Sequence, residues 1–70
     1  MTHVPVQSSN LESVAFEDGT LEIKFKGNPH LYRYQATADE HKTLMGAPSK
    51  GKYFAATFKK RAFQKIKPES

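Results

Sequence analysis

Seventy residues are enough for one small domain and too few for a second hydrophobic core. The chain has no cysteine, which excludes disulfide bridges and thiolate metal sites and favours a reducing, cytoplasmic location. It contains neither an apolar run of about 20 residues nor a basic-then-apolar leader at its start. We therefore expect a protein of the cytoplasm that does not associate with membranes.

Charge is distributed unevenly along the chain. Residues 49–70 carry seven basic residues and one acidic residue, whereas residues 1–48 carry four basic and six acidic residues. Such an asymmetry concerns the partner of a protein rather than its fold. The cationic C-terminal third indicates a surface for an anionic molecule.

Residues 1–7 show no periodic pattern, and we expect them to be loose or to lie along a sheet edge. Residues 12–17 and 20–26 alternate between apolar and polar, and Asp18-Gly19 between them favours a two-residue type I′ turn. The turn sets a register in which large apolar side chains of both strands share one face: Phe16 opposite Leu21, and Val14 opposite Ile23.

A third strand is predicted over residues 30–35, after the turn at 27–29. Tyr32 and Tyr34 are two residues apart, so their rings point to the same side. We interpret both as core residues, with stacking on nucleobases as the alternative. The outward face is expected to carry Leu31 and Arg33, together with Glu22, Lys24 and Lys26.

Two helices are expected next. Thr37 and Glu40 form a capping box at the start of the first, which we expect to end at Gly46. Its buried side chains at helical spacing are expected to be Ala38, His41, Leu44 and Met45.

The second helix begins at Ser49, after Pro48. It buries Phe54 and Phe58, with Lys59, Lys60 and Arg61 on the opposite side. Phe63 and Ile66 either extend this apolar stripe or belong to a separate tail segment.

The predicted fold class is α+β: a three-stranded antiparallel meander followed by two helices packed on one face, in the order βββαα. We assign residues 1–70 to one domain with a loose N-terminus at 1–7 and a basic C-terminal tail at 64–70.

The amino end of the second helix is the strongest candidate binding feature. Its unpaired N–H groups and positive dipole end favour an anion. Ser49, Lys50, Gly51 and Lys52 lie at this end, so the sequence predicts an anion pocket there.

Known catalytic and metal-binding patterns fit poorly. Residues 46–52 have the glycine and lysine spacing of a P-loop, but Tyr53 replaces the Ser or Thr that would hold magnesium, and a helix precedes the motif where a strand is required. The three histidines have no ligand spacing. Combinations of Ser8 or Ser9 with His41 and Asp39 lack a nucleophile elbow, and Glu12 and Glu22 are expected to be surface charges. We expect no enzymatic activity, no metal site and no cofactor.

Several segments resemble the KTSC domain family in order and spacing. They are Ser8-Ser9, the alternating hairpin, Tyr32-Arg33-Tyr34, and residues 47–54, in which Ala47, Ser49, Gly51, Tyr53 and Phe54 match the family pattern. The resemblance covers roughly residues 4–63. The chain departs from the family pattern in a longer turn at 27–29 and in having Ala36-Thr37 before the first helix.

The KTSC domain occurs as a stand-alone bacterial protein and at the C-terminus of some lysyl-tRNA synthetases. The resemblance therefore implies a bacterial or phage protein and raises the hypothesis of RNA binding.

Two functions remain open. The first is binding of RNA or tRNA by a monomer, with phosphate contacts from the C-terminal third and stacking by aromatic rings. The second is a protein-interaction module that recruits an acidic partner or pairs at an open sheet edge. The candidate nucleic-acid-binding residues are Ser49, Lys50, Gly51, Lys52, Lys59, Lys60, Arg61 and Lys65, and, on the sheet, Tyr32, Arg33 and Tyr34.

Overall fold

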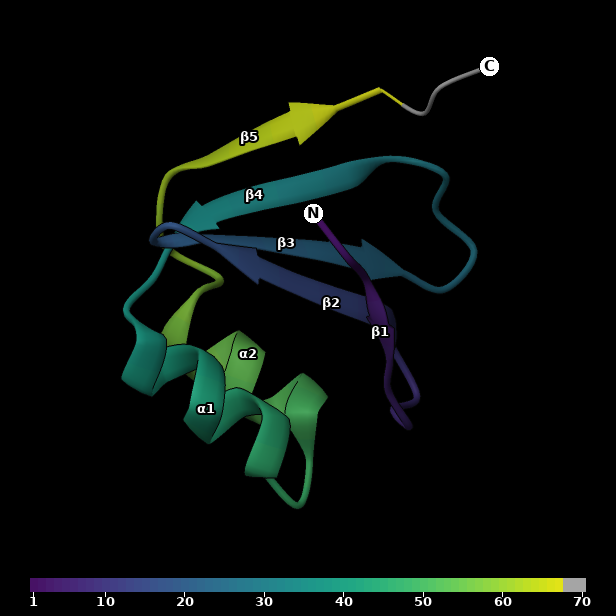
Figure 1. Cartoon of the computed structure of the whole chain (residues 1–70). Helices are drawn as coiled ribbons and strands as arrows, with labels where there is room; N and C mark the ends of the chain where they lie inside the picture. The colour runs from purple at the N-terminus through teal and green to yellow at the C-terminus, as the bar shows by residue number, and fades with distance from the viewer. Residues whose placement is uncertain (68–70) are drawn as a thin grey trace.

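The hairpin predicted around Asp18-Gly19 lies at the centre of a five-stranded sheet (Figure 1). The computed structural model describes residues 1–67. Strands β2 (Leu11–Glu17) and β3 (Thr20–Phe25) are antiparallel and have the predicted register. The turn residues Asp18 and Gly19 have φ angles of 49° and 77°, the positive values that a type I′ turn requires.

The sheet continues on both sides of this hairpin. Strand β4 (Leu31–Gln35) pairs with β3, β5 (Phe63–Ile66) pairs with β4, and β1 (Val4–Pro5) pairs with β2. All pairs are antiparallel, and the strand order is β1-β2-β3-β4-β5. The α+β class is confirmed, but the predicted number of three strands is wrong.

Both terminal segments form edge strands; for residues 1–7 this is the sheet-edge alternative rather than the loose one. Within residues 1–7, β1 is paired, and most of the described part of the 64–70 segment belongs to β5. Phe63 and Ile66 are three residues apart, so in a strand they point to opposite faces. Phe63 lies opposite Tyr34 and Ile66 opposite Leu31. The rest of the predicted tail, residues 68–70, lies outside the described residues.

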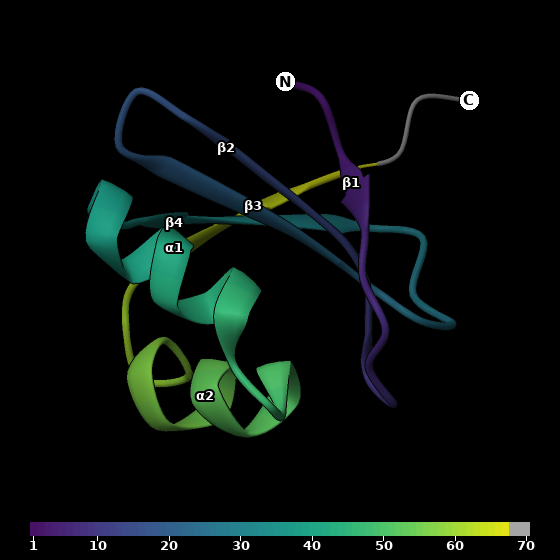
Figure 2. The same ribbon diagram turned by 60° about the horizontal axis from the view of Figure 1, so that its bottom comes forward.

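Helices α1 (Ala38–Gly46) and α2 (Lys50–Thr57) lie on the same side of the sheet (Figure 2). The capping box of α1 is confirmed: the Glu40 N–H donates to Thr37 Oγ1 at 3.1 Å, and the Thr37 N–H donates to Glu40 Oε1 at 3.0 Å. Helix α1 ends at Gly46 without a left-handed glycine cap. Ala47 is extended, with φ −69° and ψ 138°, because Pro48 follows it.

The core lies between the helices and the sheet. Phe54 of α2 and Phe58 at its C-cap are buried as predicted. The expectation for α1 is partly wrong: Leu44 is buried, His41 and Met45 are half-buried, and Ala38 is exposed. The half-buried His41 ring stacks on Phe16 with centroids 4.8 Å apart. The largest fully buried side chains are Leu11, Val14, Leu21, Ile23, Leu44 and Phe58.

An aromatic cluster fixes α2 on the sheet. The Phe54 ring makes edge contacts with Phe25 and Tyr34 at centroid distances of 5.4 and 5.2 Å, and Phe58 lies 5.9 Å from Tyr34. Such contacts add to the free energy gained from burial alone. They place the end of α2 beside β4, and therefore beside β5.

Candidate nucleic-acid interface

The amino end of α2 has the predicted cap. The Lys52 N–H donates to Ser49 Oγ at 3.4 Å, and Ser49 is extended, as an N-cap residue is. A Cβ atom added at Gly51 would lie 3.5 Å from Asn10 Nδ2, so the loop between β1 and β2 approaches this first turn closely. The helix end is therefore partly covered from the β2 side.

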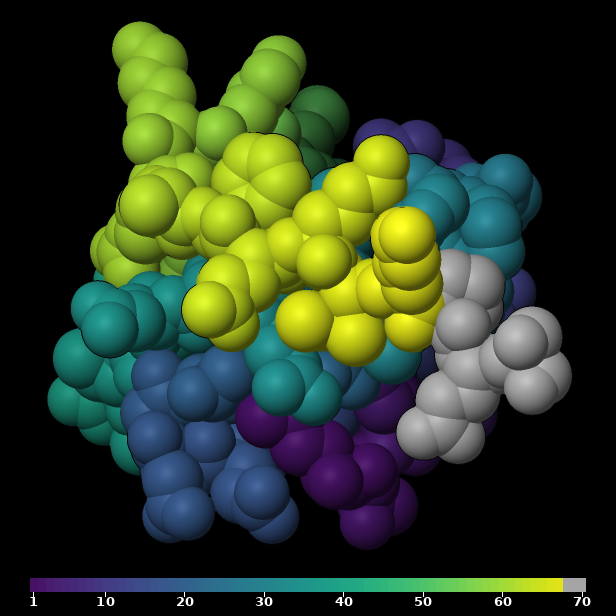
Figure 3. Space-filling view, turned by 90° about the horizontal axis from the view of Figure 1, so that it is seen from above, coloured from purple at the N-terminus to yellow at the C-terminus, as the bar shows by residue number. Residues whose placement is uncertain are grey.

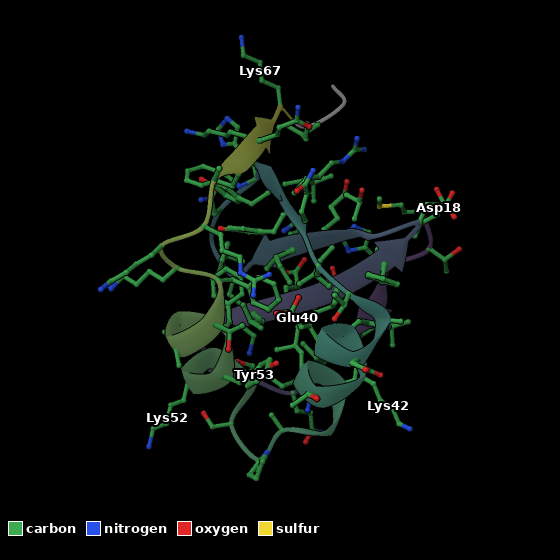
Figure 4. All side chains as sticks on the ribbon, turned by 90° about the vertical axis from the view of Figure 1, so that its left-hand side faces the viewer. Asp18, Glu40, Lys42, Lys52, Tyr53 and Lys67 are labelled. Atoms are coloured by element: carbon green, nitrogen blue, oxygen red, sulfur yellow. The ribbon has the colours of Figure 1, made fainter. Side chains whose placement is uncertain are left out.

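An open depression of about 790 Å³ lies where α1 meets α2, and Lys42, Ser49, Lys52 and Tyr53 are among its lining residues. Figure 4 shows the labelled Lys42 and Lys52 side chains extending outward from different helices and away from each other. The two ammonium groups thus do not converge on one point. Lys50 is half-buried and Lys52 is exposed.

The other predicted lysines lie after α2. Lys59 and Lys60 are exposed in the turn that follows the helix, and Lys65 is exposed on β5. The ion pairs found among residues 1–67 use His3, Lys24, Arg33 and Arg61 as the basic partners. Within those residues, no carboxylate lies within 4.0 Å of the ammonium group of the five predicted lysines: Lys50, Lys52, Lys59, Lys60 and Lys65.

Arg61 joins the end of α2 to α1. Its guanidinium binds both carboxylate oxygens of Glu40, donates to the Gln35 carbonyl at 3.0 Å, and lies 4.6 Å from the centre of the Phe58 ring. The hydrogen bonds from Arg61 and then from the Thr37 N–H lower the pKa of Glu40 to about 2. These contacts occupy the guanidinium that the sequence suggested for phosphate binding.

The predicted triplet on β4 is divided between the two faces of the sheet. Tyr34 is buried at 6% exposure, and this burial raises the pKa of its hydroxyl. Arg33 lies on the face without helices and donates to Glu22 Oε2 at 2.5 Å. Tyr32 is half-buried on the helix side and accepts a hydrogen bond from Asn28 Nδ2 at 3.0 Å. Tyr32 and Tyr34 both share a face with Lys65, and Tyr32 is the partner of Lys65 across the strands.

Glu22 differs most from the expected surface charge, because its side chain is buried on the face without helices. Only 3% of the residue is exposed, and His3 Nε2 lies 2.6 Å from its Oε1 atom. Burial alone would raise the pKa of this carboxyl, but the hydrogen bonds with His3 and Arg33 outweigh burial and lower it. The second ring nitrogen of His3 lies 2.8 Å from Ser13 Oγ, so the cluster also holds β1 against β2. The sequence contained one indication of this cluster: Glu22 and Arg33 have opposite charges and were predicted to share the outward face of the sheet.

Phe63 is the surface residue that sequence reasoning did not place. It is 53% exposed on the outermost strand, and its ring lies 5.5 Å from Tyr32 and 5.7 Å from Tyr34. Figure 3 shows β5 in yellow across this side of the molecule, with long side chains of the preceding segment standing out beside it. The alternation Phe63-Gln64-Lys65 was the available signal, since it places a ring and an ammonium group on one side.

Within residues 1–67, no three His, Asp or Glu side chains are grouped closely enough to hold a metal ion. That same stretch has no helix of the length and apolar character needed to cross a bilayer.

Comparison with known proteins identifies the family. The family model described as the KTSC domain matches residues 7–63. The crystal structure of a KTSC domain protein from Yersinia pestis superposes with a TM-score of 0.85 and 33% sequence identity, over 93% of this chain and 96% of that one. A search of curated proteins gave no match. The chain belongs to the KTSC domain family.

Proposed function

We propose that this KTSC domain is a non-enzymatic RNA-binding module that contacts the phosphate backbone through the lysines of α2, the following turn and β5. The observation that supports this function is uncompensated positive charge. Five lysines of this region have no carboxylate within 4.0 Å in the described residues, whereas Lys24 and Arg33 on the sheet, and Arg61 after α2, are paired.

Uncompensated lysines favour a polyanion because each phosphate contact releases condensed counterions. A paired cation such as Arg61 would first have to lose Glu40, and we therefore leave it outside the phosphate-binding set. Tyr34 and Arg33 are also outside it, since one is buried and the other lies on the opposite face. The proposed phosphate contacts are Lys50, Lys52, Lys59, Lys60 and Lys65.

The absence of enzymatic activity is part of the proposal. The buried carboxylate of Glu22 is the residue that would most resemble a catalytic base, because buried charged groups are common in active sites. However, His3 and Arg33 occupy its two oxygens, and Arg61 occupies both oxygens of Glu40. Neither group has a free oxygen directed at a substrate.

The test is a binding titration of the whole chain against tRNA, single-stranded RNA and duplex DNA at low and at moderate salt. We expect RNA binding that weakens as salt rises, with each phosphate contact contributing roughly 0.7 to the logarithmic slope for a single strand. The double variant Lys59→Gln with Lys60→Gln should lower both the affinity and the slope, and so should Lys50→Gln with Lys52→Gln.

The matched control is Lys24→Gln with Lys26→Gln, which removes the same charge from two lysines that lie outside the C-terminal third and outside the depression between α1 and α2. If the control weakens binding as much as the other two pairs, net charge rather than this surface determines binding. If the wild-type chain binds no RNA at low salt, the proposed function is wrong.

The position of β5 favours a second candidate function. This strand is at the edge of the sheet, and an edge strand can pair with an extended segment of another protein. The lysines beside it would select an acidic segment. Such a partner would bind the chain without RNA, which separates this candidate from the first.

A further inference from the structure

An exposed aromatic ring on β5 is the least explained feature of the surface. Phe63 is 53% exposed, and the other large hydrophobic residues that are exposed within residues 1–67, Met1 and Val4, belong to the N-terminal segment. Met1 precedes β1 and Val4 belongs to it, and β1 is the edge strand on the other side of the sheet. Phe63 is therefore separated from them by the width of the sheet.

One side of the Phe63 ring packs against aromatic side chains of β4. Tyr32 and Tyr34 on the neighbouring strand contact it with interplanar angles of 57° and 38°. Tyr34 in turn packs against Phe54 and Phe58 in the core. The inner side of the ring is thus fixed to the aromatic core, and the exposed half is presented on a strand rather than on a mobile loop.

Lysines precede and follow this ring along the chain. Lys65 is two residues further along β5, so it points to the same face, and it lies opposite Tyr32. Lys59 and Lys60 are exposed in the turn before β5. No described carboxylate lies within 4.0 Å of these three ammonium groups.

We propose that Phe63 and Tyr32, together with Lys59, Lys60 and Lys65, form a stacking platform for the bases of single-stranded RNA. This inference rests on the proposed function and specifies its ligand. An exposed ring beside lysines matches a nucleotide, in which a flat base is attached to a phosphate. A duplex covers its base faces by internal stacking, so the platform selects single strands. The carboxylates of an acidic peptide would satisfy the lysines but would not themselves stack on the ring.

The test compares three probes of equal length: a single-stranded oligoadenylate of about eight nucleotides, the same oligonucleotide with its bases removed, and a base-paired RNA. We expect the oligoadenylate to bind at least about fivefold more tightly than the abasic probe, the lower limit for stacking of one base. Phe63→Leu keeps an apolar side chain on Tyr32 and Tyr34 but removes the flat ring. It should lower affinity for the oligoadenylate about fivefold or more, leave the abasic probe unchanged, and preserve the salt slope.

Two further variants complete the design. Phe63→Trp retains a flat ring and should keep the affinity of the wild type. Val4→Ala removes an equally exposed apolar side chain from the other edge strand and should change none of the three affinities. Circular dichroism and thermal unfolding verify that each variant is folded.

The outcomes separate the platform from the proposed function. If the abasic probe and the oligoadenylate bind equally, or if Phe63→Leu binds the oligoadenylate like the wild type, the platform is wrong and phosphate binding stands. If none of the three probes binds, both are wrong. Equal loss of affinity for all probes in Phe63→Leu would also overturn the platform, because stacking cannot act on a probe without bases.

Discussion

Glu22→Gln tests whether the buried carboxylate stabilises the fold. Glutamine keeps the shape of the side chain and removes its charge: its amide oxygen can accept from Arg33 while its NH2 group faces His3 Nε2, so both contacts become hydrogen bonds of a neutral group. A hydrogen bond to a charged group contributes about 1 kcal/mol more than a neutral one, and there are two such bonds. Because 40% of the Arg33 side chain is exposed, solvent screening reduces its share. We therefore expect a loss of about 1–2 kcal/mol in the free energy of unfolding at neutral pH.

Urea unfolding followed by circular dichroism measures this difference. With a slope of about 1–2 kcal/mol per molar urea for a small domain, the midpoint should fall by about 1 M. The pKa of Glu22 is lower in the folded chain than its ordinary value of 4.5, so the charged carboxylate stabilises the fold above that pH. The contribution disappears as the pH falls through the folded-state pKa. The gap between wild type and variant should therefore close at low pH.

Glu12→Gln is the matched control on the same sheet. Glu12 lies 2.8 Å from Lys24, but its side chain is 51% exposed, so its removal should cost less than about 0.5 kcal/mol. If Glu22→Gln is as stable as the wild type at neutral pH, or if the gap stays constant as the pH falls, the assigned role of the cluster is refuted.

Two further substitutions test the fold. Gly19→Val should lower the midpoint of thermal unfolding more than a typical surface change, because φ at this position is 77° and β-branched residues rarely adopt such angles; an unchanged midpoint would contradict the turn. Phe58→Ala removes a ring that is 0% exposed and should cost about 3–5 kcal/mol in unfolding free energy, which leaves little folded protein; a well-dispersed, native-like NMR spectrum would contradict the packing of α2.

The elements that the sequence predicted well are those whose signal is local. The Asp18-Gly19 turn sets both its own backbone angles and the register of the strands it joins. The capping box at Thr37 likewise involves atoms only three residues apart. In both cases the deciding contacts lie within a few residues of the chain, where residue type and spacing describe them.

The edge strands could not be predicted in the same way. Strand β1 has two residues and β5 has four, and each is stabilised by a neighbour that the local sequence does not specify. Because β1 was not predicted, His3 could not be placed beside Glu22, and the charged side chains of the outer face were expected to be exposed to solvent. The burial of Glu22 depends on Arg33 of β4 and on His3, which directly precedes β1, so it follows only from the complete strand order.

The sequence predicted most of the residues of the candidate site, but it did not predict where all of them lie or which of them are already bound to a carboxylate. The five lysines of the proposed interface were all identified from the basic C-terminal third. Arg61 and Arg33 have the same charge, but each is bound to a carboxylate that is distant in sequence. Phe63 was considered only as part of the helical stripe or of a tail, because its spacing from Phe58 and Ile66 fits a helix as readily as a strand.

The strand order has a consequence for folding. The loops that close β2 on β3 and β3 on β4 contain two and five residues, whereas 27 residues, including both helices, separate β4 from β5. Short loops close with a smaller loss of entropy and more quickly. We therefore expect the three central strands to form early and β5 to join after the helices have docked. Amide hydrogens of β5 should then exchange with solvent sooner than those of β3, and the surface around Phe63 would exist only in chains that have completed folding.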